Sequence, residues 1–180
     1  MVKEQPIFVE SFFRIVPDKN NQTNLIQQNL FFYYDDPMKN YLKLKNTGAL
    51  TGELEFIQRN LQYLIDEDDL FINKKKIRMK ILSTSLIFHR KNTRFPFLLF
   101  NITSNPFQFI NNSINEINLD AQPEKITYPA ISVWETYIGR FISVVSPSYR
   151  IMSKDQFQVI FLLAKGVIVG GNEKLMILVN

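Results

Sequence analysis

The side chains that most often perform catalysis or bind transition metals are almost missing from this sequence. There are no cysteines, and His89 is the only histidine. The lack of cysteine excludes thiolate metal sites, disulfides and cysteine nucleophiles. A zinc site of histidine and carboxylate normally uses two or more histidines, and a serine–histidine–aspartate triad would have to use His89. The sequence therefore predicts a protein that is not an enzyme, with no catalytic residue, no metal site and no cofactor.

Oxygen ligands are concentrated in the acidic run of residues 66–69. A calcium loop would need a central glycine and a glutamate at its twelfth position, and the run has neither. We interpret it as a solvated loop at the end of a helix. Glycines 166, 170 and 171 lack the spacing and the Lys-Ser/Thr pair of a phosphate-binding loop. Catalysis by carboxylates such as Asp66 or Glu135 is an alternative, but nothing in the spacing of the acidic residues identifies a catalytic pair.

Basic residues are concentrated in residues 74–94, a stretch that alternates like two strands joined by a turn. If Arg78 and Lys80 share a face, they begin a positive stripe that continues to the turn. Such a stripe can contact phosphates, although an ordinary charged sheet surface gives the same pattern. The sequence therefore offers nucleic acid as an alternative partner, contacted by a basic patch of Lys74, Lys75, Lys76, Arg78, Lys80, Arg90, Lys91 and Arg94.

Aromatic and amide side chains are unusually frequent. The chain has 16 Phe, 7 Tyr, 17 Asn and 10 Gln. Most of the rings should belong to the core, but aromatic residues are also enriched where protein interfaces are buried. We expect the single tryptophan to be a core residue or an interface anchor, and the apolar tail to supply further anchors. The candidate anchors are Trp134, Leu175, Ile177 and Val179.

Hydrophobic periodicity predicts more strands than helices. Strands are expected over residues 7–16, 30–34, 41–45, 76–89, 95–103 and 130–145, with a bend at Gly139. Residues 76–103 form the clearest hairpin. An amphipathic helix is expected over 51–65, where a strand is the alternative. A capping-box pattern followed by Gly166 predicts a second helix over 153–165.

The order of these elements lacks the regular alternation of strand and helix that builds a parallel sheet. We expect a single α+β domain over residues 1–180 that is mainly antiparallel β. It would be a sandwich, or a sheet with two short helices. Residues 111–125 are expected to form a long surface loop, and residues 167–179 a closing hairpin. The apolar run 175–179 should be a strand that is paired inside the sheet or added to a neighbouring subunit.

Composition narrows the class of protein further. The 180 residues carry a formal charge of +4, and 46% are hydrophobic. No apolar run approaches the length of a membrane span and no signal peptide is recognisable, so we expect no membrane contact and an intracellular or virion location. The abundant Asn, Lys, Ile and Phe point to an AT-rich genome. The interpretation is a structural or interaction subunit of a larger homo- or hetero-oligomeric assembly, such as a phage or other virion component.

Overall fold

Two β-sheets and two helices make up the computed structural model, which describes residues 5–18, 22–89 and 92–179. The larger sheet has the strand order β10 (Arg150–Lys154), β11 (Gln158–Leu163), β8 (Ala130–Thr136), β1 (Pro6–Asp18), β2 (Thr23–Tyr34), β6 (Asn92–Ser104) and β5 (Met79–His89). The smaller sheet has the order β4 (Lys75–Ile77), β3 (Asp69–Ile72), β7 (Ser113–Lys125), β12 (Ile168–Val179) and β9 (Arg140–Val145). All neighbouring strands are antiparallel except β1 and β8, which run parallel.

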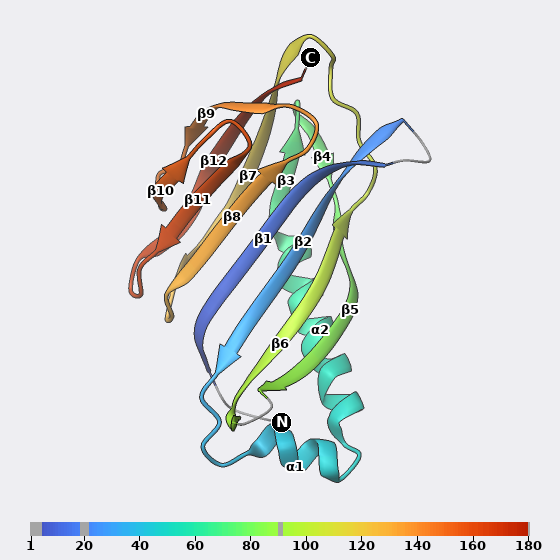
Figure 1. The fold of residues 1–180 in the computed structure, drawn as a ribbon, viewed down its shortest axis with the longest axis vertical. Helices are drawn as coiled ribbons and strands as arrows, with labels where there is room; N and C mark the ends of the chain where they lie inside the picture. Colours follow the sequence, from blue (N-terminus) through green and yellow to red (C-terminus); the bar gives the residue numbers. More distant parts are fainter. Residues whose placement is uncertain (1–4, 19–21, 90–91, 180) are drawn as a thin grey trace.

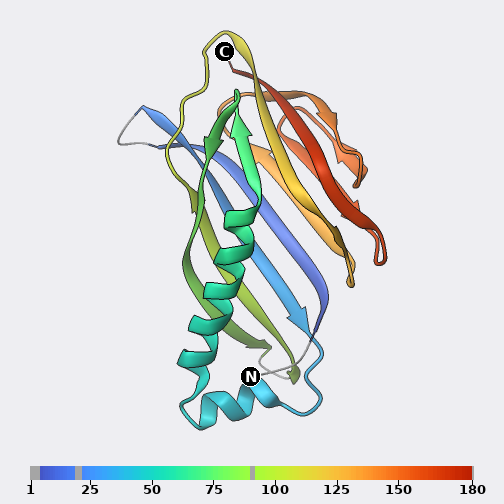
Figure 2. The same cartoon turned by 180° about the vertical axis from the view of Figure 1, so that it is seen from behind.

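The two sheets pack face to face around one main core. Ile15 and Ile26 from the larger sheet meet Ile117 and Ile177 from the smaller sheet, and each is at most 1% exposed. The smaller sheet covers one part of the larger sheet's inner face, and the helix α2 (Leu50–Glu67) covers the rest (Figures 1 and 2). The α+β, mainly antiparallel class expected from the sequence is therefore confirmed, and of the two expected architectures the structure combines packed sheets with two short helices.

The helix α2 confirms the helical interpretation of residues 51–65. Its apolar stripe includes Leu54, Ile57 and Leu61, which pack against the second core cluster around Leu98 and Phe100. Gln62 also links the helix to the edge strand β5. Its Nε2 donates to the carbonyl of Met79 at 3.1 Å, and its Oε1 accepts from the N–H of Ile81 at 2.8 Å. These two hydrogen bonds satisfy backbone groups that an edge strand would otherwise expose to water.

The predicted hairpin of residues 76–103 is confirmed in its main part. Strands β5 and β6 pair antiparallel, and the last described pair at the turn is His89 with Asn92. Lys76 lies before this hairpin, in the short strand β4 of the other sheet. Residues 90 and 91, which include two of the predicted basic contacts, lie outside the described part of the chain.

Residues 41–45 are helical and not a strand. They belong to α1 (Asn40–Asn46). The fully buried carboxylate of Asp36 accepts from the N–H of Asn40 at 2.8 Å and of Tyr41 at 2.9 Å. These are among the N–H groups that have no partner inside a helix, so Asp36 fixes where the helix begins.

The helix predicted over residues 153–165 is also wrong. This segment forms strands β10 and β11, which pair antiparallel. Asp155 makes the turn between them, because its Oδ1 accepts from the N–H groups of Phe157 and Gln158, each at 2.7 Å. Val159, Phe161 and Leu163 then alternate into the core, where none is more than 4% exposed.

The long loop predicted over residues 111–125 is instead the strand β7, which lies between β3 and β12. Its polar side chains misled the prediction. Asn115 is fully buried, and its amide exchanges hydrogen bonds with the backbone of Ile110 at 2.8 and 2.9 Å. Ile117 follows on the inner face. Buried amides with partners are compatible with a strand inside a sheet.

One further predicted element is wrong, and another is confirmed only in part. The closing hairpin of residues 167–179 is a single strand, β12, with a bulge between Val169 and Gly171. The long strand of residues 130–145 is divided between the two sheets as β8 and β9. Gly139 lies in the connection, where an added Cβ would come 2.4 Å from the carbonyl oxygen of Leu178. Glycine allows this close approach of two backbones.

Candidate interaction face

The outer face of the seven-stranded sheet carries a cluster of five aromatic side chains. No helix or strand of the described chain lies over this face (Figure 1). Register places the rings side by side, because Phe8 pairs with Tyr33 and Tyr33 with Phe97. We call the set the outer aromatic cluster: Phe8, Phe12, Phe31, Tyr33 and Phe97.

The rings of the cluster pack on one another. Their centroids are 5.4 Å apart for Tyr33 and Phe97, 5.9 Å for Phe12 and Phe31, and 6.0 Å for Phe31 and Phe97. These separations lie in the range of favourable aromatic pairs. Each ring is therefore half-buried by its neighbours, while the cluster as a whole stays open to the outside.

A row of polar side chains crosses the same face beside the aromatic cluster. Asn29 donates to Asn101 at 2.6 Å, and Asn101 donates to Ser83 at 2.8 Å. In the other direction Arg14 donates to Asn29 at 3.4 Å and lies 3.5 Å from Glu135. Gln158 completes the row by donating to Glu135 at 3.0 Å. We call this set, from Ser83 to Gln158, the polar row.

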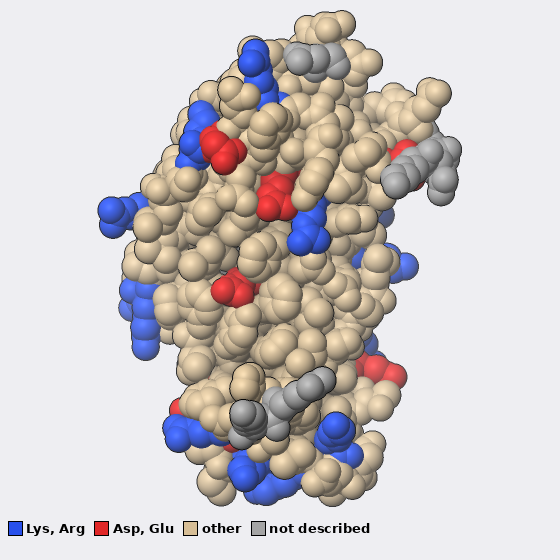
Figure 3. Space-filling model, viewed as in Figure 1, with Lys and Arg blue, Asp and Glu red and all other residues tan. Residues whose placement is uncertain are grey.

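Charged groups are sparse over the middle of this face (Figure 3). Arg14 and Glu135 largely compensate each other within the polar row. The carboxylate of Glu10 accepts from the Tyr33 hydroxyl at 2.6 Å. Burial and this nearby carboxylate raise the pKa of Tyr33 to about 12, so the phenol keeps its proton. The face thus offers aromatic rings, amides and little net charge.

The predicted basic patch is not assembled as one surface. Lys74 lies at the turn between β3 and β4, while Arg94 lies at the far end of the β5–β6 hairpin (Figure 2). The intervening strand β5 has 11 residues and spans about 36 Å at the rise of an antiparallel strand. Arg94 makes a bidentate ion pair with Asp35, at 2.5 and 2.8 Å, and Lys76 pairs with Asp69. The exposed basic residues Lys75, Arg78 and Lys80 lie near Lys74 in the sequence.

The predicted interface anchors are core residues of this chain. Trp134 is 6% exposed and stacks on Phe13 with centroids 4.0 Å apart. Leu175, Ile177 and Val179 are at most 5% exposed, because β12 is paired on both sides by β7 and β9. The tail is therefore paired inside the sheet, and these side chains have no free surface for a partner.

Sequence reasoning missed the outer aromatic cluster as a surface, although its signal was present. In β1 the alternating positions Phe8 and Phe12 face outward, while Val9 and Phe13 face inward. A strand that is apolar on both faces indicates two covered faces. Here only the inner face is covered by the described chain.

Comparison with known protein families, curated proteins and solved structures gave no match. Within the described residues, no group of three acidic or histidine side chains could hold a metal ion. The helices described are all too short or too polar to cross a membrane. The function of this chain is therefore inferred from the geometry of its faces and cavities.

Proposed function

We propose that this chain is a structural subunit that assembles through the outer face of its seven-stranded sheet. The observation that carries the proposal is the open outer aromatic cluster, flanked by the polar row. Interfaces between proteins are enriched in aromatic residues at their centre and depleted of charge. A virion of an AT-rich genome is the setting that the composition favours.

The partner that this face fits is a second copy of the same chain. Two copies of one surface meet in a symmetric dimer only if the surface does not repel itself. The mixed charges of Glu10, Arg14 and Glu135 leave the face with little net charge. The amides of Asn29 and Asn101 can both donate and accept, so they can pair with identical groups across a two-fold axis.

Light scattering combined with size-exclusion chromatography tests the proposal over a range of protein concentrations. The wild-type chain should show a mass that rises with concentration. The substitution Phe31→Asp puts a charge at the centre of the outer aromatic cluster and should weaken self-association by at least about tenfold, or about 1.4 kcal/mol. A wild-type chain that stays monomeric throughout would contradict the proposal.

The matched control is Ile114→Asp, which places the same charge on the smaller sheet. Ile114 is 55% exposed, so this substitution should leave folding and self-association unchanged. A second variant, Ile160→Lys, covers the case in which Phe31→Asp unfolds the chain. Ile160 pairs with Val133 on the outer face, at the far side of that face from β6. Equal effects of the Ile114 and Ile160 variants would show that the outer face is not the interface.

A further inference from the structure

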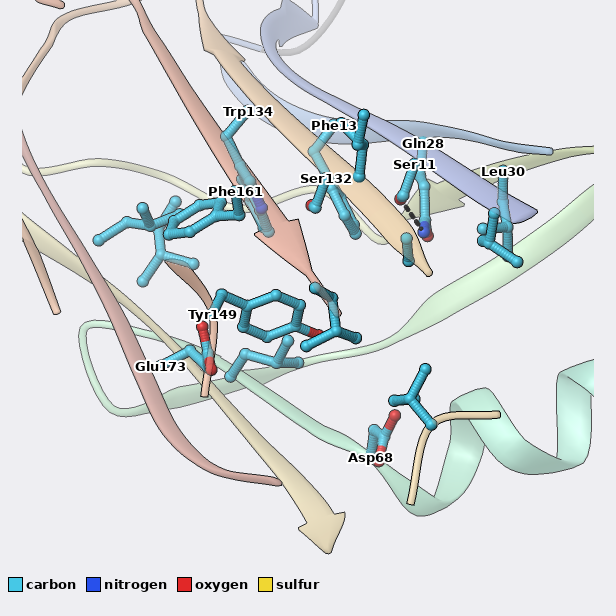
Figure 4. A pocket seen from close by; sticks show the side chains of 18 of the residues that line it. Ser11, Phe13, Gln28, Leu30, Asp68, Ser132, Trp134, Tyr149, Phe161 and Glu173 are labelled. Atoms are coloured by element: carbon cyan, nitrogen blue, oxygen red, sulfur yellow. Dashed lines mark hydrogen bonds between the residues drawn. The ribbon is translucent and has the colours of Figure 1, made fainter. Parts of the chain in front are cut away.

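A cavity of about 300 Å³ lies between the two sheets. Its walls are mostly apolar and come from both sheets. Trp134 and Ser132 lie on the larger sheet's side, and Tyr149 and Glu173 lie together on the other side (Figure 4). The volume is at the lower end of the range for small-molecule sites in proteins. It has room for about ten groups of the size of water or methylene.

Glu173 is the unusual residue of this cavity. On β12 it takes the inward position of the alternating row that continues with Leu175, Ile177 and Val179, all of which are buried. A carboxylate in a core-facing row is rare unless a partner compensates for its burial. The hydroxyl of Ser146 and the backbone N–H of Ser148 donate to it. Within the described chain, its Oε1 is buried and has no hydrogen-bond partner.

A second carboxylate, that of Asp68, also lines the cavity, and it follows the end of α2. Burial, with a further contribution from the nearby carboxylates of Glu173 and Asp68, raises the pKa of the Tyr149 phenol to about 12. Tyr149 is therefore a neutral hydrogen-bonding group at neutral pH. The polar side of the cavity thus combines two acids with a phenol.

The only basic residue lining the cavity in the described chain is Lys174, and its ammonium faces elsewhere. It lies next to Glu173 on the strand, so alternation directs its side chain to the other face of the smaller sheet. There its Nζ is 3.3 Å from the carboxylate of Glu116. No cation of the described chain therefore lies within the cavity to neutralise Glu173.

A second cleft adjoins the cavity beside α2 and shares Asp68, Tyr128 and Trp134 with it. Leu61 and Leu64 of α2 line the cleft together with Lys76 and Arg78, and Leu64 is 55% exposed. The cleft therefore lies between the cavity and an exposed part of α2.

We propose that the cavity between the sheets binds a small apolar amine, with the protonated amino group at the carboxylate of Glu173 and the apolar part against Trp134 and Phe161. An ammonium supplies the positive charge that no cation of the described chain brings to this carboxylate, and it adds hydrogen-bond donors to those of Ser146 and Ser148. The apolar walls of the cavity contact the apolar part of the bound amine and keep water away from it. This site is separate from the outer face and does not depend on the proposed assembly.

Trp134 is the only tryptophan, so its fluorescence reports directly on the cavity. The probes are decylamine, decanol and decanoate, which share one chain and differ in the head group, each titrated below its micelle concentration. Decylamine should give a saturable change at a concentration at least roughly tenfold lower than decanoate, since hydrogen bonds to charged groups are the strong ones. No saturable change, or tighter binding of decanoate, would overturn the proposal.

Substitution Glu173→Gln keeps the shape of the side chain and removes the charge. It should weaken the binding of decylamine by roughly tenfold or more and leave the binding of decanol unchanged. Glu116→Gln is the matched control on the other face of the same sheet, and it should change neither titration. Ser132→Leu fills the cavity from the opposite wall and should weaken the binding of all three probes. Each variant is first shown to melt like a folded protein. Unchanged decylamine binding by Glu173→Gln or by Ser132→Leu would overturn the site.

Discussion

At the scale of single residues, Glu173 is the main departure from the simple pattern of inward apolar and outward polar side chains. Burial raises its pKa to about 7 from 4.5, although the hydrogen bonds from Ser146 and Ser148 act in the opposite direction. Among the ionisable residues that line the same cavity, Tyr149 interacts with Glu173, and the pKa of Tyr149 lies far above this range. Glu173 therefore takes up its proton near neutral pH.

The raised pKa of Glu173 predicts a dependence of stability on pH. Between about pH 4.5 and 7 the folded chain holds a proton on Glu173 that the unfolded chain has lost. The contribution of Glu173 to the free energy of unfolding is then at its maximum below pH 4.5, and it is lost as the pH rises through 7. We expect Glu173→Gln to melt at a higher temperature than the wild type at pH 8, and the difference to shrink by pH 5.

Thermal melting at several pH values measures this effect. The difference between the wild-type and Glu173→Gln curves isolates Glu173 from all other titrating groups. Glu116→Gln should melt in parallel with the wild type. A Glu173→Gln variant that melts below the wild type at pH 8 would show that the carboxylate is stabilising there, contrary to the direction of its pKa.

The sequence could have indicated Glu173 but not its environment. The alternation from residue 173 to residue 179 puts this glutamate in register with three apolar residues. The prediction of a hairpin turn at glycines 170 and 171 hid that register. Its donors Ser146 and Ser148 and the phenol of Tyr149 come from another segment of the chain, so no spacing could have shown them.

At the scale of elements, local hydrogen bonds decided the cases where the residue pattern was ambiguous. Residues 41–45 alternate between apolar and lysine side chains, which fits a strand. Asp36 instead caps the backbone of Asn40 and Tyr41 and begins a helix. Asp155 caps a turn inside the segment predicted as a helix. Long segments with a strong period, such as α2, were predicted correctly because many residues contribute to the signal.

Asp36→Ala should destabilise the fold by about 1–3 kcal/mol, because it leaves the buried N–H of Tyr41 and the partly buried N–H of Asn40 without an acceptor. Chemical denaturation measures this loss. Asp35→Ala is the matched control at the adjacent position. It removes only the exposed ion pair with Arg94, so we expect a much smaller change. Equal losses for the two variants would show that the hydrogen bonds of Asp36 do not hold α1 in place.

At the scale of the whole molecule, strand order determines which surfaces are covered. Strand β1 pairs with β2 on one side and with the distant β8, in parallel, on the other. The smaller sheet and α2 both take the inner face of the larger sheet, which leaves the outer aromatic cluster open. The sequence supports the α+β class and several of the strands. It cannot show which of two apolar faces becomes the core, since that depends on pairings between distant segments.

The position of β12 gives the last prediction. This strand is paired on both sides in the smaller sheet, and its residues Leu175, Ile177 and Val179 belong to the main core. A chain that ends at Lys174 would expose the edges of β7 and β9 and open the core. We expect it to lose cooperative thermal melting. Substitution Ile177→Ala in the full chain should cost about 2–5 kcal/mol by leaving a cavity. Met176→Ala, on the other face of the same strand, should cost clearly less. A truncated chain that still melts cooperatively near the wild-type temperature would show that the smaller sheet is stable without β12.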